Sequence, residues 1–200
     1  MSFYSVDQFI REHYPQYWGY ETYPQDRCVC IRKVSDEWGI LCNFAPTPLV
    51  VNGVEFKSSE ELFQMMKFKD VEILDRIRRN VTREGKICYQ IKKTVKSYEK
   101  EYRRDDWGAI FIDAMKFCLE TKYEQSEEFR QALESTGNLY IVEDQSSFPK
   151  RNPDAWGVKS CGSEFSGPNL LGRLLMELRN NATLTYTLPS DALDFLKFFV

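Results

Sequence analysis

The spacing of apolar side chains predicts that this chain of 200 residues is mostly helical. Apolar residues recur every three or four positions in residues 107–121 and 168–179, as they do on the buried face of an amphipathic α-helix. Two shorter runs, residues 28–34 and 48–56, are rich in Val and Ile and are typical of strands. We therefore expect helices accompanied by a few short strands.

Capping and turn residues mark the ends of further elements. The additional predicted helices cover residues 6–12, 71–79 after the capping residue Asp70, 83–102 after Thr82, and 127–135 after Ser126. Asn52-Gly53 predicts a tight hairpin, and residues 139–142 predict a short strand. Residues 144–167 are rich in Gly, Pro and Ser and are expected to form a loop. No repeat or long linker divides the chain, which indicates one domain.

The stretch from Ser58 to Phe68 predicts a buried helix with an unusual polar row. Its other side chains are apolar on nearly all sides, which is typical of a buried helix. Glu60, Gln64 and Lys67 stand at positions i, i+4 and i+7, so they lie in one row on that helix. Buried polar and charged groups are costly unless they are paired or used. The row is therefore either a candidate active site or a structural ion-pair network.

Composition narrows the possible classes of protein and of site. No apolar run reaches membrane length and no signal peptide stands at the start, so we expect a soluble cytoplasmic protein without a membrane partner.

The six cysteines lack zinc-site spacing, and reduced, buried thiols are expected rather than metal ligands or disulfides. We expect neither a metal nor a cofactor. With His13 as the one histidine, acid–base chemistry would fall to carboxylates, lysine or tyrosine.

Charge is distributed unevenly along the chain. Residues 76–104 contain eleven basic and three acidic residues, a net charge of +8, although the whole chain carries −3. Such a segment can bind the phosphates of a nucleic acid, or it can be a solvated helical face. Nucleic acid is therefore a possible partner of residues 76–104.

The helix predicted from Pro168 to Arg179 carries a second candidate site. Pro168 suits the first helical position, and Asn169 and Arg173 follow it one turn apart. A free helix N-terminus beside these two polar side chains is typical of an anion site. The alternative is an ordinary amphipathic helix in which Arg173 forms a salt bridge.

Four separated stretches resemble the YbiA-like, or NADAR, family. They are Trp38-Gly39-Ile40-Leu41-Cys42-Asn43-Phe44, Ser59-Glu60 with Phe63-Gln64 and Lys67-Phe68, Asp154-Ala155-Trp156-Gly157, and the stretch from Gly167-Pro168-Asn169 to Arg179. The resemblance covers about residues 37–180. It implies an α+β, mainly α-helical single domain with a few short strands. We place this domain at residues 28–180, with extensions at 1–27 and 181–200. The chain departs from the family pattern at Cys42, Glu61-Leu62 and Met65-Met66.

The resemblance also implies hydrolysis of an N-glycosidic bond. Glu60 would stabilise charge at the anomeric carbon or activate water, and Lys67, which matches the family's lysine, would be a nucleophile or would orient the substrate. Asp154 is a second acid–base candidate. The expected substrate-binding residues are Asn43, Phe44, Gln64, Trp107, Trp156, Gly157, Asn169 and Arg173.

Three functions remain open from the sequence. The first is removal of ADP-ribose from ADP-ribosylated guanine in nucleic acid or nucleotides. The second is an N-glycosidase that acts on ribosylated phosphate intermediates of riboflavin biosynthesis. The third is a non-catalytic module that binds ADP-ribose or NAD-like ligands. The basic segment 76–104 favours the first over the second, and the presence of Glu60 and Lys67 disfavours the third.

Overall fold

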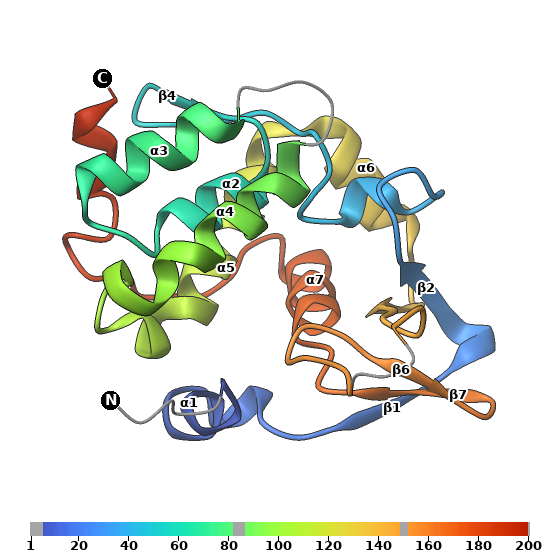
Figure 1. Ribbon diagram of the computed structural model, residues 1–200. Coiled ribbons are helices and arrows are strands. Elements are labelled where there is room, and N and C mark those ends of the chain that lie inside the picture. The colour runs from blue at the N-terminus through green and yellow to red at the C-terminus, as the bar shows by residue number, and fades with distance from the viewer. Residues whose placement is uncertain (1–5, 82–86, 149–151, 200) are drawn as a thin grey trace. The chain divides into compact units, whose positions relative to one another are not determined.

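The predicted α+β fold, mainly helical with short strands, is confirmed by a computed structural model of the chain. The structure describes residues 6–81, 87–148 and 152–199, which contain seven α-helices and seven short β-strands (Figure 1). No helix in these ranges is both long enough and apolar enough to cross a membrane. The predicted cap Thr82 lies outside the described residues.

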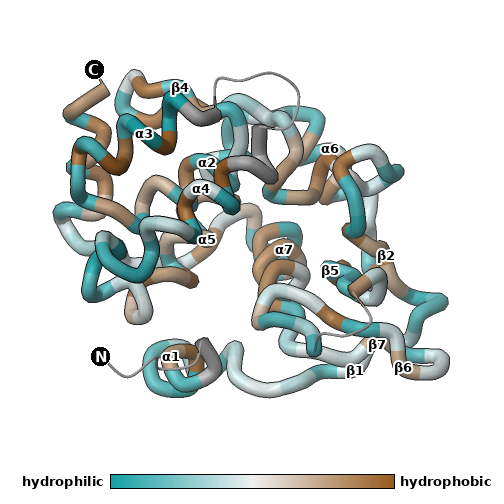
Figure 2. The backbone as a smooth tube through the Cα atoms, in the orientation of Figure 1, coloured by the Kyte–Doolittle hydropathy of each residue, from teal (hydrophilic) through white to brown (hydrophobic). Residues whose placement is uncertain are grey.

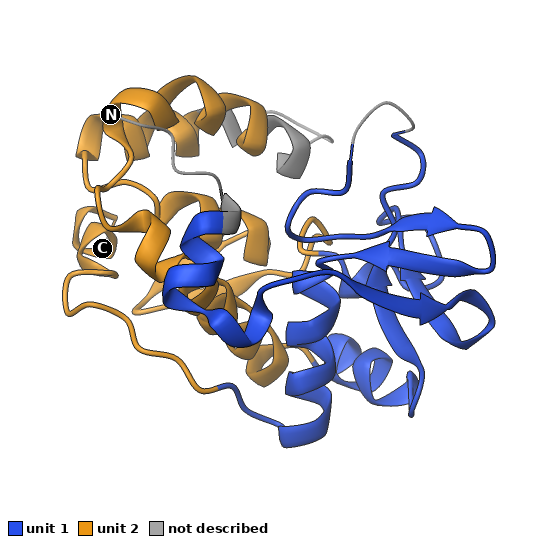
Figure 3. Cartoon of the chain, turned by 90° about the horizontal axis from the view of Figure 1, so that it is seen from below, with its two compact units in different colours: residues 1–42, 127–184 blue, residues 43–126, 185–200 orange. Residues whose placement is uncertain are grey.

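The chain divides into two compact units, each made of two separated stretches (Figure 3). Unit 1 contains Met1–Cys42 and Glu127–Leu184, and unit 2 contains Asn43–Ser126 and Thr185–Val200. Each unit therefore combines a long stretch with a segment distant from it in the sequence.

Unit 1 contains two small sheets and three α-helices. Its antiparallel sheet has the order β1 (Glu21–Pro24), β7 (Glu164–Gly167), β6 (Lys159–Cys161), and its parallel pair is β2 (Cys28–Ile31) with β5 (Tyr140–Glu143). The helices are α1 (Val6–His13), α6 (Glu127–Ser135) and α7 (Leu170–Asn181), and 3-10 turns cover Pro15–Tyr17, Gln25–Arg27 and Gly39–Leu41. Buried Tyr23, Val142, Val158 and Phe165 form a core cluster of this unit.

The helix α7 packs closely against β5. An ideal Cβ on Gly172 would stand only 1.9 Å from the carbonyl oxygen of Ile141, so only glycine allows this approach. The neighbouring leucines of α7 are buried, and the helix is largely brown in Figure 2. This contact fixes the N-terminal end of α7 relative to β5.

Two predictions in unit 1 were wrong. Residues 144–167 do not form a continuous loop, because β6 and β7 pair there as a hairpin. These strands have only three and four residues, so the alternation of β7, in which Phe165 and Gly167 are buried, is too short to stand out in the sequence. Pro168 is not the first helical residue, because α7 begins at Leu170 and Asn169 adopts a left-handed conformation with φ 50°.

Unit 2 is built around the buried helix α2 (Ser59–Met65). Its other elements are α3 (Val71–Val81), α4 (Ile87–Tyr102), α5 (Trp107–Gln125), the hairpin of β3 (Leu49–Val51) and β4 (Val54–Phe56), and a 3-10 turn at Asp194–Phe198. The predicted hairpin is confirmed, with φ of 49° at Asn52 and 82° at Gly53. The predicted cap at Asp70 is also confirmed, since its Oδ1 accepts hydrogen bonds from the amides of Glu72 and Ile73.

Candidate active site

The N-terminal end of α2 is capped by two side chains, one just before the helix and one in its first turn. Ser58 Oγ accepts a hydrogen bond of 3.2 Å from the amide of Glu61, and Glu61 Oε2 accepts one of 2.7 Å from the amide of Lys57. Burial raises the pKa of Glu61, and the Lys57 amide opposes that shift. Glu61 therefore has a structural role as a capping residue.

Glu60 and Gln64 lie together on the buried side of α2. Gln64 Nε2 donates a hydrogen bond of 2.7 Å to Glu60 Oε1, and the amide of Glu60 donates to the carbonyl of Asn43 at 3.1 Å. Gln64 Oε1 is buried and has no hydrogen-bond partner among the residues that the structure describes. A buried acceptor without a partner beside a carboxylate is a typical place for a ligand donor to bind.

Lys67 lies just beyond α2 rather than on it. The helix ends at Met65, and the amide of Lys67 donates to the carbonyl of Gln64 at 3.4 Å. The carbonyl of Lys67 accepts a hydrogen bond of 2.9 Å from the amide of Arg104. The predicted row therefore consists of two helical residues and one residue in the following turn, which main-chain bonds hold in place.

The Lys67 amine lies between two aromatic rings and one carboxylate. Its Nζ is 5.8 Å from the centre of the Phe63 ring and 5.7 Å from that of Trp107. The same Nζ forms an ion pair with Glu99 of α4. The Lys67 side chain is 11% exposed and that of Glu99 is 31% exposed, so the pair lies at the edge of the core.

Burial lowers the pKa of Lys67, and nearby charges modify that shift. Glu99 opposes it most strongly and Glu60 opposes it less, since both carboxylates favour the ammonium form. Lys92 of α4 favours the neutral amine, and its Nζ lies 5.7 Å from the Phe44 ring. The net direction is downward, so this amine loses its proton more readily than a solvated lysine does.

Asn43 and Trp107 are both tied into the packing of unit 2. The carbonyl of Asn43 accepts from Ser59 Oγ at 3.2 Å, and its Nδ2 donates to Met115 Sδ at 3.2 Å. Trp107 is the first residue of α5, and its ring centre is 5.2 Å from that of Phe63. Unit 2 thus brings together six of the predicted site residues: Asn43, Phe44, Glu60, Gln64, Lys67 and Trp107.

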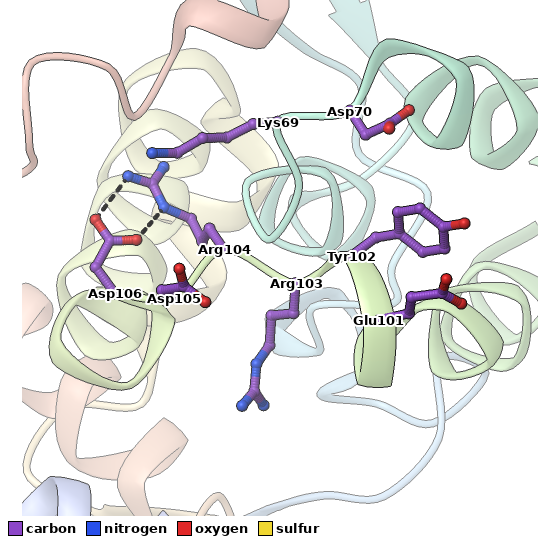
Figure 4. Close-up of a pocket in the computed structure, with 8 residues that line it drawn as sticks. All are labelled: Lys69, Asp70, Glu101, Tyr102, Arg103, Arg104, Asp105 and Asp106. Carbon is purple, nitrogen blue, oxygen red and sulfur yellow. Dashed lines mark hydrogen bonds and ion pairs between the residues drawn. The ribbon is translucent and has the colours of Figure 1, made fainter. Parts of the chain in front are cut away.

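An open pocket of about 560 Å³ lies where the turn after α2 meets the end of α4 (Figure 4). It is lined by Lys69, Asp70, Glu101, Tyr102, Arg103, Arg104, Asp105 and Asp106. Arg104 binds both carboxylate oxygens of Asp106, at 2.6 and 2.9 Å, and Asp191 at 2.9 Å. These bonds hold the pKa of Asp106 below its usual range. The Arg104 network therefore attaches the C-terminal segment of unit 2 and is a structural feature.

In unit 1, the predicted site residues near the start of α7 bind one another. Asp154 Oδ1 accepts hydrogen bonds from Gln145 Nε2 at 2.7 Å and from the amide of Trp156 at 3.0 Å. The carbonyl of Gly157 accepts from the amide of Asn169 at 3.1 Å. Asp154 itself is exposed, so one carboxylate oxygen remains accessible.

The predicted free N-terminus of α7 is not free. Its first two amides, of Leu170 and Leu171, donate to the carbonyls of Ala155 and Trp156 at 3.0 and 3.2 Å. Asn169 is fully buried, with Nδ2 bound to the carbonyl of Ile141 at 2.9 Å and Oδ1 bound to the amide of Glu143 at 3.2 Å. Main-chain carbonyls thus occupy the position where the sequence predicted an anion.

Arg173 binds the N-terminal segment of unit 1. Its guanidinium donates to the carbonyls of Gln16 and Tyr17 at 2.7 and 3.1 Å and forms an ion pair of 3.2 Å with Glu21. The Tyr17 hydroxyl donates to Glu177, one turn further along α7. These contacts match the alternative considered for Arg173, a salt bridge on a closing helix.

Sequence reasoning did not single out Glu99. A signal for Glu99 was present, because it follows the buried residues Ile91 and Val95 at helical spacing. An acid at such a core-facing position needs a partner. Phe63 was part of the motif that carries the family resemblance, but it was not among the predicted site residues.

The described residues contain no group of three or more His, Cys, Asp and Glu side chains that could hold a metal ion. The described cysteines are free thiols, at positions 28, 30, 42, 118 and 161. Cys118 is buried, but Cys161 is exposed, so the expectation of buried thiols was wrong there.

A comparison of this chain with known families identifies its family. Residues 30–182 match the NADAR domain. The chain belongs to the NADAR family. The predicted resemblance is therefore confirmed, over more than half of the chain.

Individual members of the NADAR family are similar over most of this chain. The N-glycosidase YbiA of Escherichia coli K12 is 30% identical over 160 residues, which cover 80% of this chain and 91% of that protein. The NMR structure of E. coli YbiA is 29% identical, with a TM-score of 0.62, and the match covers 79% of this chain and 86% of that one. A riboflavin biosynthesis protein of Vibrio vulnificus, VVA0006, is 30% identical over 142 residues, 70% of this chain and 35% of that protein.

Replacing Arg173 with Ala should loosen the N-terminal segment of unit 1. The variant loses bonds to two carbonyls and one carboxylate, so we expect a loss of about 1–3 kcal/mol in unfolding free energy and faster chymotryptic cleavage near Tyr17. Arg76→Ala is a suitable control, because the Arg76 side chain is 58% exposed and its ion pair spans 3.9 Å. Unchanged stability and cleavage together with weaker substrate binding would favour the predicted substrate-binding role instead.

Proposed function

We propose that this chain is an N-glycosidase whose reaction is carried by Glu60 and Lys67. The observation that supports this most is the buried amine of Lys67, which lies beside the paired rings of Phe63 and Trp107 and interacts electrostatically with Glu60. Breaking a bond between sugar and base builds positive charge at the anomeric carbon. A buried carboxylate stabilises that charge, and an amine that loses its proton readily can attack the same carbon. The N-glycosidase names of the YbiA relatives support the same reaction class.

The substrate that we favour is guanine that carries ADP-ribose, in nucleic acid or as a nucleotide. Support comes from four basic side chains at or just beyond α4: Lys93, Lys96, Lys100 and Arg103. They are exposed, and their spacing of three, four and three residues places them along one face. At 1.5 Å per residue this basic stripe is about 15 Å long, which is enough to contact several phosphates of one strand.

Ribosylated phosphate intermediates of riboflavin biosynthesis are the second candidate substrates. The specific observation in favour is the similarity to riboflavin biosynthesis proteins of Vibrio vulnificus and of Zea mays. The chain spans 35% and 28% of those two proteins, so their whole activity is not carried over. A small substrate of this kind would not need the basic stripe of α4.

The decisive experiment is incubation of the protein with three compounds: an oligonucleotide that bears ADP-ribosylated guanine, the corresponding free nucleotide, and a phosphoribosyl-amine. We expect release of ADP-ribose from the oligonucleotide, measured by mass spectrometry. Release only from the phosphoribosyl-amine would favour the second candidate. Tight binding without release from any compound would favour a non-catalytic ligand-binding module.

Replacing Glu60 with Gln should reduce turnover by about 10²–10⁴ while the protein stays folded, because this is the usual contribution of an acid–base group. The measurement is kcat for ADP-ribose release, with circular dichroism as the test of folding. Glu61→Gln is the matched control, since Glu61 is buried on the same helix but bonds to the Lys57 amide. We expect Glu61→Gln to affect stability more than turnover of the folded fraction. Equal turnover in Glu60→Gln and the wild type would exclude Glu60 from the chemistry.

If Lys67 is the nucleophile, it forms a Schiff base with the opened sugar during turnover. Borohydride added with substrate should then attach the sugar to Lys67, detected by peptide mass spectrometry. Lys67→Arg should abolish both the adduct and the activity, because a guanidinium does not lose its proton. Lys92→Arg is the control and should still form the adduct. Activity in Lys67→Arg would instead support water activated by Glu60.

Replacing Lys93, Lys96 and Lys100 together with Ala should weaken binding of the oligonucleotide but not of the free nucleotide. Three lost phosphate contacts should reduce the slope of log K against log salt by about 2 for a single strand. The paired change Arg76→Ala and Arg79→Ala serves as the control, because these side chains on α3 already bind Glu72 and Asp75. An unchanged salt slope in the triple variant would indicate that the stripe is only a solvated face.

A further inference from the structure

The ion pair between Lys67 and Glu99 differs from the ion pairs that Arg104 forms in unit 2. The Arg104 network uses a guanidinium, which stays charged and binds Asp106 through two parallel hydrogen bonds. Lys67 instead offers a single amine that can lose its proton when it is buried. The partner carboxylate comes from α4, a separate helix, and reaches the amine directly. Such a pair is suited to exchange a proton as well as to hold charge.

Burial and a like charge make the Lys67 amine easier to deprotonate. Phe63 and Trp107 border the amine with rings, and the Lys67 side chain is nearly buried. Lys92, on the same helix as Glu99, adds a like charge that disfavours the ammonium. Glu60 also acts on the amine, and it favours the ammonium less strongly than Glu99 does. Among these charged groups, Glu99 therefore has the strongest influence on whether Lys67 keeps its proton.

We propose that Glu99 is the proton acceptor of Lys67: it takes the ammonium proton through the ion pair and so frees the amine to attack the substrate. This inference rests on the proposed N-glycosidase function with Lys67 as nucleophile. In the first step the Glu99 carboxylate becomes a carboxylic acid and the Lys67 ammonium becomes an amine. Opening of the sugar ring breaks the bond between the anomeric carbon and the ring oxygen, moves the proton of the base nitrogen to that oxygen, and leaves a double bond between the anomeric carbon and the base nitrogen. The amine nitrogen then bonds to the anomeric carbon while this double bond becomes a single bond, and one amine proton moves to the base nitrogen.

The proton held by Glu99 balances the remaining steps. As the bond between the anomeric carbon and the base nitrogen breaks, Glu99 returns its proton to the leaving nitrogen, and the sugar stays on Lys67 as a protonated imine. Water then adds to the protonated imine, which releases the sugar as an aldehyde and restores the Lys67 ammonium. The sum is one water consumed for one N-glycosidic bond broken. Glu99 ends as a carboxylate, ready for the next substrate.

Three measurements on Glu99→Gln and Glu99→Ala test this proposal. The first is the pH profile of Lys67 acetylation by brief pulses of acetic anhydride, quantified by mass spectrometry, which reports the neutral amine without substrate. The second is the pH profile of kcat/KM. The third is rescue of Glu99→Ala by added formate, a small carboxylate that can replace the missing proton acceptor. Glu101→Gln is the matched control, because Glu101 is an exposed acid on the same helix.

In Glu99→Gln we expect the acetylation profile of Lys67 to move down by about 1–3 pH units, because an opposite charge has been removed. Turnover should nevertheless fall by about 10²-fold or more, since the proton acceptor is lost. Formate should restore part of the activity of Glu99→Ala, and Glu101→Gln should resemble the wild type. More free amine with less turnover is a combination that neither a structural nor a purely electrostatic role produces.

Several outcomes would overturn the proposal. An unchanged acetylation profile in Glu99→Gln would show that the ion pair does not control the amine. Turnover that is unchanged or raised would show that Glu99 only holds the charge. Absence of formate rescue would point to a structural role. If the wild-type protein cleaves no N-glycoside, the proposed function fails and this step fails with it, while the acetylation profile still reports whether the pair exists.

Discussion

The burial of α2 is the constraint on which unit 2 depends. All seven residues of this helix are buried, and they include two glutamates and a glutamine. Each polar group therefore needs a partner within the protein. Ser58 and Lys57 are the partners of Glu61. Gln64 is the partner of Glu60. Just past the helix end, Glu99 is the partner of Lys67.

These pairings divide the polar groups of α2 into structural and chemical ones. Glu61 bonds to the main-chain amide of Lys57, so its carboxylate is used in capping the N-terminal end of the helix. Glu60 and Lys67 bond to side chains instead, and side chains can move when a substrate arrives. Gln64 Oε1 has no partner in the part of the chain that the structure describes, and a ligand donor would satisfy it. Burial thus accounts both for the lowered pKa of Lys67 and for the buried acceptor Gln64 Oε1 that has no partner among the described residues.

The sequence predicted the arrangement of the candidate residues in unit 2 better than that of the candidate residues in unit 1. Glu60, Gln64 and Lys67 were found because polar residues within an apolar helix are conspicuous, and the periodicity of one helix is a local property. Asn169 and Arg173 were also conspicuous, but their partners are carbonyls of Ile141 and Gln16, which no side-chain pattern encodes. The hairpin of β6 and β7 was missed for another reason, because strands of three and four residues are too short for their alternation to stand out.

Glu99 shows where local patterns stop being informative. Its position on the core-facing side of α4 indicates that it needs a partner, but the identity of that partner depends on how α4 packs against α2. Such packing is set by many apolar contacts at once, among them those of Ile91 and Val95. The polar row in the sequence indicated Lys67, the family resemblance suggested its role, and the structure shows the carboxylate that pairs with it.

The central claim is that burial makes the Lys67 amine easier to deprotonate than an ordinary lysine, although two carboxylates act on it. The most direct test is a pH titration of the lysine Nζ resonances by NMR in the wild-type protein, with Lys67 assigned by its absence in Lys67→Arg. The account predicts a Lys67 pKa clearly below the ordinary value of 10.5. A Lys67 pKa at or above that value would contradict it, because the ion pair with Glu99 would then outweigh burial and the amine would remain charged.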